Sequence, residues 1–227
     1  MTATNASVLP ERLPARPGRE QSSGEELANS LSHGAGLIAA LIGTPYLVIN
    51  AVRSGSAAYV VGISVFCASI LFLYLSSTLY HAWVVGKAKR VFRIVEHCAI
   101  FVLIAGTYTP LALGVLRGPW GWALLGAVWS LAIAGVTLKA FHQATRPVLF
   151  TSLYLVMGWL VVLVVEPLLA SMPTAGLLLL LAGGLFYTVG VIFFATDYRL
   201  KYGHFIWHLF VILGTVCHYF AVLGYGI

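Results

Sequence analysis

The sequence has little charge and few cysteines. Only 9% of its 227 residues are Asp, Glu, Lys or Arg, whereas 60% are hydrophobic. A typical soluble domain has about 25% charged residues. This shortage excludes a soluble globular domain, a disordered chain, a coiled coil and a nucleic-acid-binding protein. The three cysteines, Cys67, Cys98 and Cys217, all lie in apolar runs, so we expect no disulfide framework.

The apolar residues form seven stretches, each long enough for a membrane-spanning helix of about 20 residues. Helices are expected because, in lipid, backbone polar groups must be hydrogen-bonded within the segment. The predicted spans are residues 31–52, 57–82, 92–114, 119–139, 147–167, 174–196 and 204–225. The predicted fold class is therefore an all-α integral membrane protein, with a seven-helix membrane domain at residues 25–227.

Residues 1–24 differ from the rest of the chain. They contain Pro10, Pro14 and Pro17, several Ser and Thr, and little apolar sequence. This composition predicts a disordered N-terminal tail. We do not interpret it as a signal peptide, because no apolar segment precedes the first long span.

The cations are distributed unevenly between the two sides of the predicted membrane domain. Eleven lie on the side of the N-terminus, and only Arg53 and Arg117 lie on the other. The eleven are Arg12, Arg16, Arg19, Lys87, Lys89, Arg90, Arg93, Lys139, Arg146, Arg199 and Lys201. Because cytoplasmic loops of membrane proteins are enriched in Lys and Arg, we predict a cytoplasmic N-terminus and an outside C-terminus.

Six of the seven histidines are expected near the inner leaflet, and only His218 lies deeper, about 15 Å beyond His208 at about 1.5 Å per residue. His204 and His208 have i,i+4 spacing, which places both imidazoles on one helix face. His81 ends a second span at the same depth and could supply a third ligand. Glu96 could be a fourth ligand or could hold a metal-bound water. Three histidines with one open position are typical of catalytic zinc.

These residues also have interpretations that involve neither a metal site nor catalysis. An HxxxH pattern arises easily by chance, and histidines near the interface often only hydrogen-bond lipid headgroups or neighbouring helices. Ser77, one turn before His81, could donate to a carboxylate or to a metal-bound water, or could simply pack between helices. A Ser-His nucleophile is disfavoured because no oxyanion donor is visible. Asn29 or Ser30 is expected to cap the first span.

Several motifs resemble those of the haemolysin III proteins, bacterial members of the progestin and adiponectin receptor superfamily. The opening motif is residues 25–33 (EELANSLSH), and residues 77–81 (STLYH) resemble the family's Ser-x-x-x-His motif. Residues 96–101 (EHCAIF) with 105–110 (AGTYTP) are similar to its third-span signature. Residues 202–208 (YGHFIWH) resemble its last motif, with His218 following. The likeness covers about residues 25–225.

The resemblance implies seven helices with a cytoplasmic N-terminus and a zinc ion near the inner leaflet. It implies His81, His204 and His208 as the zinc ligands, with Ser77 and the acidic residue of the third span beside them. Here the sequence departs from the family, which typically has Asp where this chain has Glu96. Relatives point to metal-dependent hydrolysis of lipid amides or esters.

The leading functional hypothesis is a zinc-dependent membrane lipid hydrolase of the bacterial inner (plasma) membrane, with membrane lipids as partners and lipid substrates. Glu96 and Ser77 are the predicted catalytic residues. One alternative is a non-catalytic sensor or regulator of membrane state with structural zinc. Another is a pore-forming or lytic protein, disfavoured because the outer halves of the spans are apolar. A haem site on paired histidines is a remote fourth.

Overall fold

The computed structural model describes residues 20–142 and 147–226. Seven helical segments in these residues are long and apolar enough to cross a membrane, which confirms the predicted fold class. The elements are α1 (Ser23–Arg53), α2 (Ala57–Ala82), α3 (Lys87–Leu113), α4 (Pro119–His142), α5 (Pro147–Gly158), the 3-10 helix η1 (Leu160–Val164), α6 (Val165–Ser171), α7 (Thr174–Thr196) and α8 (Gly203–Tyr225).

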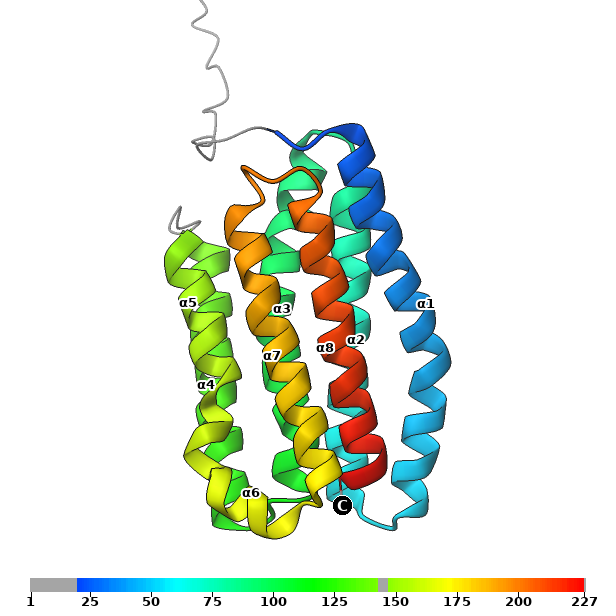
Figure 1. Ribbon diagram of the computed structural model, residues 1–227, viewed down its shortest axis with the longest axis vertical. Helices are drawn as coiled ribbons and strands as arrows, with labels where there is room; N and C mark the ends of the chain where they lie inside the picture. The colour runs from blue at the N-terminus through cyan, green and yellow to red at the C-terminus, as the bar shows by residue number, and fades with distance from the viewer. Residues whose placement is uncertain (1–19, 143–146, 227) are drawn as a thin grey trace, which may run out of the picture.

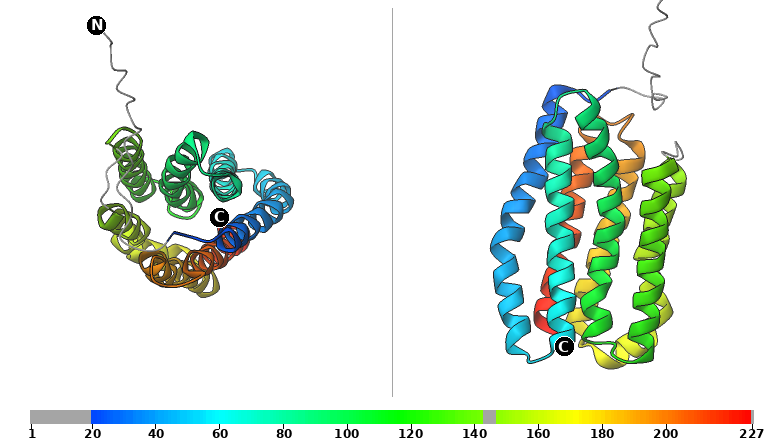
Figure 2. Two further views of the ribbon diagram at one scale, coloured as in Figure 1. Left: turned by 90° about the horizontal axis from the view of Figure 1, so that it is seen from above. Right: turned by 180° about the vertical axis from the view of Figure 1, so that it is seen from behind.

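The long helices run alternately up and down and form a ring (Figures 1 and 2). Neighbours along the chain pack against each other, and α8 closes the ring against α1. Helix α3 contacts α5 and α8 as well as α2 and α4. Large apolar side chains such as Ile42, Ile133 and Leu163 are exposed on the outside of the bundle, as expected of a surface that faces lipid.

Helix α1 begins earlier than the sequence predicted. Ser22, rather than Asn29 or Ser30, is the N-cap: its hydroxyl accepts from the Glu25 N–H, and the Glu25 carboxylate accepts from the Ser22 N–H. This capping box draws residues 23–30 into the helix, so the predicted caps are wrong and helix replaces the end of the predicted tail. Residues 1–19 of that tail lie outside the described residues.

Glu25 also joins α1 to the start of α8. Its Oε1 accepts from the backbone N–H of Tyr202 at 2.8 Å. Tyr202 has a left-handed backbone with φ of 60°, a conformation that a non-glycine residue adopts at some cost. The contact fixes the turn before α8 against the first turn of α1.

The fifth span is broken, whereas the sequence predicted one helix over residues 147–167. Helix α5 ends at Gly158, η1 follows, and α6 continues to Ser171, beyond the predicted end. The Tyr108 hydroxyl donates to the Gly158 carbonyl at 2.6 Å and accepts from the Val161 N–H at 3.0 Å. A break inside a membrane requires such partners because lipid offers none. Tyr108 therefore makes this break tolerable.

Candidate metal centre

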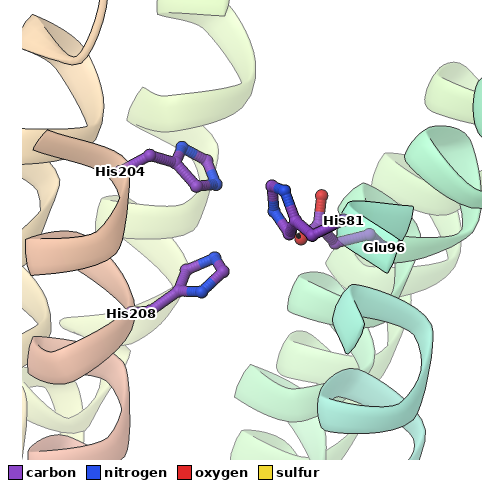
Figure 3. Close-up of side chains that lie close together, drawn as sticks. All are labelled: His81, Glu96, His204 and His208. Carbon is purple, nitrogen blue, oxygen red and sulfur yellow. Dashed lines mark ion pairs between the residues drawn. The ribbon is translucent and has the colours of Figure 1, made fainter. Parts of the chain in front are cut away.

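Four polar side chains from three helices meet in the end of the bundle where α1 begins. They are His81 at the end of α2, Glu96 in α3, and His204 and His208 in the first turns of α8. All four are buried, and one possible ligand atom from each lies within 4.8 Å of the others. Figure 3 shows His204 and His208 pointing from α8 toward His81 and Glu96 on the opposite side. The structure thus brings together the three predicted metal ligands and the predicted acidic residue.

A hydrogen bond fixes the orientation of each of these imidazoles. His204 Nδ1 lies 3.0 Å from Asp197 Oδ2, and His81 Nδ1 lies 2.7 Å from Glu26 Oε2. A carboxylate oxygen only accepts, so both Nδ1 atoms carry the proton. This assignment leaves a lone pair on Nε2 of each neutral ring.

His208 is held in the same way by α1. Its Nδ1 lies 3.0 Å from Ser32 Oγ and 3.2 Å from the Asn29 carbonyl oxygen. The Ser32 hydroxyl already donates to that carbonyl at 2.8 Å, so His208 Nδ1–H is the donor to both. The lone pair of His208 is therefore also on Nε2.

At the centre of the site, several hydrogen-bond acceptors point toward one another. The Nε2 atoms of His81, His204 and His208 are buried without a hydrogen-bond partner. His81 Nε2 faces Glu96 Oε1 across 3.5 Å, although with Nδ1 protonated neither atom has a proton to donate. Buried lone pairs directed at one another are unfavourable unless a cation lies among them. The three imidazole nitrogens fit the ligand set of a metal ion, with the Glu96 carboxylate beside them.

Ser77 and His33 extend the site from Glu96 toward α1. Ser77 Oγ donates to Glu96 Oε1 at 2.7 Å, and His33 Nδ1 lies 2.7 Å from Ser77 Oγ. Since the one hydroxyl proton is on the Glu96 side, His33 Nδ1–H donates to Ser77. The His33 ring stacks on His208 with centroids 3.6 Å apart. Glu96 is thereby held from one side by Ser77, which is itself held by His33.

The remaining histidines lie outside this cluster of four. His97 is next to Glu96, but its Nδ1 bonds the Arg93 carbonyl at 2.6 Å. His218 lies deeper, on α8. His142, which lies beyond the predicted span of residues 119–139, is the last residue of α4.

Sequence reasoning missed the residues that orient the ligands. Glu26, Asp197, Asn29 and Ser32 were not assigned to the site, although each bonds a ligand histidine. One signal could have found two of them: Glu26 and Asp197 are acidic residues at the predicted inner ends of apolar spans, where a charge is costly.

An apolar cavity of about 390 Å³ adjoins the candidate metal centre. Its walls come mainly from α3, the broken fifth span, α7 and α8, with Leu73 of α2. A smaller pocket contains His33, Glu96, His204 and His208. The two share Leu73, Ile100, Trp207 and Val211, so the polar site and the cavity meet at a common wall.

Fold and site together define a multi-pass membrane protein with a buried histidine and carboxylate cluster that could hold a metal ion. The sequence profile of the "Haemolysin-III related" family matches residues 22–219, and the chain belongs to that family. It is 45% identical over 201 residues to "Hemolysin-3 homolog" of Bacillus subtilis (strain 168), covering 88% of this chain and 94% of the relative. It is 44% identical over 201 residues to "Hemolysin-3" of Bacillus cereus, covering 88% and 91%.

Similarity also extends to mammals. The chain is 31% identical over 223 residues to human "Monocyte to macrophage differentiation factor", covering 94% of this chain and 90% of the relative. This match supports membership of the progestin and adiponectin receptor superfamily, and the resemblance found from the motifs is confirmed.

Proposed function

We propose that this protein is a zinc-dependent hydrolase of lipid amide or ester bonds in the bacterial inner membrane. The observation that carries the proposal is the convergence of three unpartnered Nε2 atoms and the Glu96 carboxylate beside an apolar cavity. The convergence of these polar atoms suits a metal that activates water, and the apolar cavity suits an acyl chain.

Zinc is the metal favoured by the donor set, because three neutral imidazoles leave a position open in a tetrahedral site. His81, His204 and His208 would hold it, each oriented by its own acceptor on Nδ1. When bound, zinc supplies a Lewis acid that polarises a carbonyl group and lowers the pKa of water to about 7.

Glu96 is the proposed general base. Its carboxylate takes one proton from the attacking water as the new C–O bond forms at the lipid carbonyl carbon. It returns that proton to the departing nitrogen or oxygen as the amide or ester bond breaks, which yields a fatty acid and an amine or alcohol. Ser77 orients Glu96 by donating to Oε1, so its proposed role is positioning.

The position of the site also suits a lipid substrate. If the positive-inside rule holds, the site lies near the inner leaflet, within reach of cytoplasmic water. The acyl chain would lie in the cavity, whose walls are mostly Leu, Ile, Val and aromatic side chains. A water-filled pore needs a polar lining, so the apolar cavity favours an enzyme over a pore.

The test compares purified wild type with Glu96→Gln, which keeps the shape of the side chain but removes the base. We expect hydrolysis of fluorogenic acyl amides and esters to fall roughly 10²–10⁴-fold. Zinc content by elemental mass spectrometry should stay near one per chain, and the melting temperature should not change. Glu166→Gln, at an exposed position on α6, is the matched control.

Unchanged turnover in Glu96→Gln would contradict the proposal. Wild type without stoichiometric metal would contradict it as well. Stoichiometric zinc with no turnover in wild type, and unfolding on chelation, would favour a structural zinc in a membrane-state sensor.

A further inference from the structure

His33, near the start of α1, is a buried histidine to which the proposed hydrolysis assigns no step. It lies outside the group of four side chains that could hold a metal ion, and it is only 2% exposed. Its Nε2 has no hydrogen-bond partner, which is unfavourable for a buried polar atom. A role for this residue must therefore come from its ring and from its other nitrogen.

Three contacts hold the His33 ring in place. Its Nδ1–H donates to Ser77 Oγ at 2.7 Å, and its ring packs against that of Tyr74 with centroids 5.0 Å apart. The third contact is the stack on His208, in which the ring planes differ by only 6° and the centroids are 3.6 Å apart. Because Ser77 and Tyr74 belong to α2 and His208 belongs to α8, His33 is fixed where these two helices meet α1.

The stack restricts the orientation of the His208 ring. The bonds from Nδ1 of His208 to Ser32 and to the Asn29 carbonyl hold one corner of that ring. They do not fix its plane firmly, because the last side-chain torsion of a histidine has a broad energy minimum. At 3.6 Å the two rings are in van der Waals contact, so the His208 ring cannot tilt toward His33. A binding site needs its ligands held within about 0.5 Å and about 10–20° of the productive geometry.

We infer that His33 is a positioning residue of the candidate metal centre, whose flat ring fixes the plane of the ligand His208 and so the direction of its Nε2 lone pair. Asp197 orients His204 differently, through a hydrogen bond to Nδ1. For His33 the property that matters is the flat ring, so another flat ring should serve and an aliphatic side chain should not. The inference rests on the metal site of the proposed function but not on hydrolysis.

The zinc affinity of the detergent-purified full-length protein, measured by competition with a chromophoric chelator, tests the inference. His33→Leu fills the space without a flat ring, and we expect the affinity to fall about tenfold, as for the loss of other groups that orient ligands. His33→Phe keeps the ring but loses the donor to Ser77, and it should keep most of the affinity. His33→Asn can still donate to Ser77 but has no ring, so it should bind zinc as weakly as His33→Leu.

Two further measurements separate positioning from a general effect on the fold. Co²⁺ in place of zinc has visible absorption bands that depend on its coordination geometry. These bands should change in His33→Leu but not in His33→Phe. His218→Leu is the matched control, because it removes another buried imidazole, ten residues or about 15 Å along α8 from His208. Its zinc affinity and cobalt spectrum should equal those of wild type.

A wild-type affinity and cobalt spectrum in His33→Leu would overturn the inference. Equal losses of affinity in His33→Phe and His33→Leu would also overturn it, because they would assign the effect to the bond with Ser77. An equal loss in His218→Leu would overturn it by showing a general effect on the bundle.

The same measurements distinguish this inference from the proposed hydrolase activity. The expected pattern of zinc affinities without any hydrolysis would support the role of His33 and refute only the proposed function. Hydrolysis together with an unchanged zinc affinity in His33→Leu would refute only the role of His33. A wild-type protein that binds neither zinc nor cobalt would overturn both.

Discussion

At the scale of single residues, each ligand histidine is held by an acceptor on the nitrogen that faces away from the site. Asp197 is the acceptor for His204, and both side chains are buried. Outer partners of this kind fix the ring orientation and raise the basicity of the ligand. They would therefore influence the affinity of the candidate centre for a metal ion without being ligands themselves.

Asp197→Ala removes the acceptor of His204. We expect the zinc affinity to fall roughly 10–100-fold, as is usual when such partners are lost. Competition with a chromophoric chelator measures the affinity, and Glu166→Ala serves as the control for the loss of a carboxylate. An affinity equal to that of wild type would show that Asp197 does not support the site.

Local spacing made part of the site predictable. The i,i+4 pair His204 and His208 is visible in the sequence because a helix has a fixed period. The partners of the histidines are not visible, because Glu26 precedes His81 by 55 residues and meets it only after α1 packs against α2. Sequence patterns therefore suggested the ligands but did not reveal what orients them.

At the scale of the elements, the broken fifth span depends on one hydroxyl from another helix. Tyr108→Phe leaves the Gly158 carbonyl and the Val161 N–H without their partner. We expect a loss of about 2 kcal/mol in the free energy of unfolding, within the range of about 1–3 kcal/mol for an unsatisfied buried group. Denaturant unfolding in detergent measures the change.

Tyr46→Phe is the control, because Tyr46 is 58% exposed on the outer face of α1. An equal stability for Tyr108→Phe and wild type would mean that water or a rearranged backbone satisfies the break.

The bounds of the spans were predictable where the flanking sequence interrupts the apolar run. The prediction for residues 57–82 agrees with α2, which follows a polar Arg-Ser-Gly-Ser turn. The prediction for residues 174–196 agrees with α7, which follows Pro173. The fifth span reads as mainly apolar, and Gly158 within it is only a weak sign of a break. Tyr108 on α3, which satisfies the backbone groups at the break, cannot be revealed by any pattern within residues 147–167.

At the scale of the whole molecule, the distribution of cations predicts the orientation in the membrane. We expect the N-terminus in the cytoplasm and the C-terminus outside, since eleven Lys and Arg lie on one side and two on the other. A C-terminal alkaline phosphatase fusion should therefore be active and a C-terminal green fluorescent protein fusion dark. Fusions to a version lacking α8 are the control and should give the reverse pattern. A fluorescent, phosphatase-inactive full-length fusion would refute the orientation.

The closure of the ring between α1 and α8 has a consequence for biosynthesis. The ribosome makes Glu25, Asn29 and Ser32 first, yet their partners Tyr202 and His208 lie near the end of the chain. Until α8 is made, these α1 groups lack their native bonds, and His81 has neither of its histidine neighbours from α8. Contacts between the ends of a chain form late, so the centre is completed in one final step. A chain truncated before α8 therefore lacks two of the four residues of the centre, His204 and His208, and leaves the α1 groups without their partners from the end of the chain.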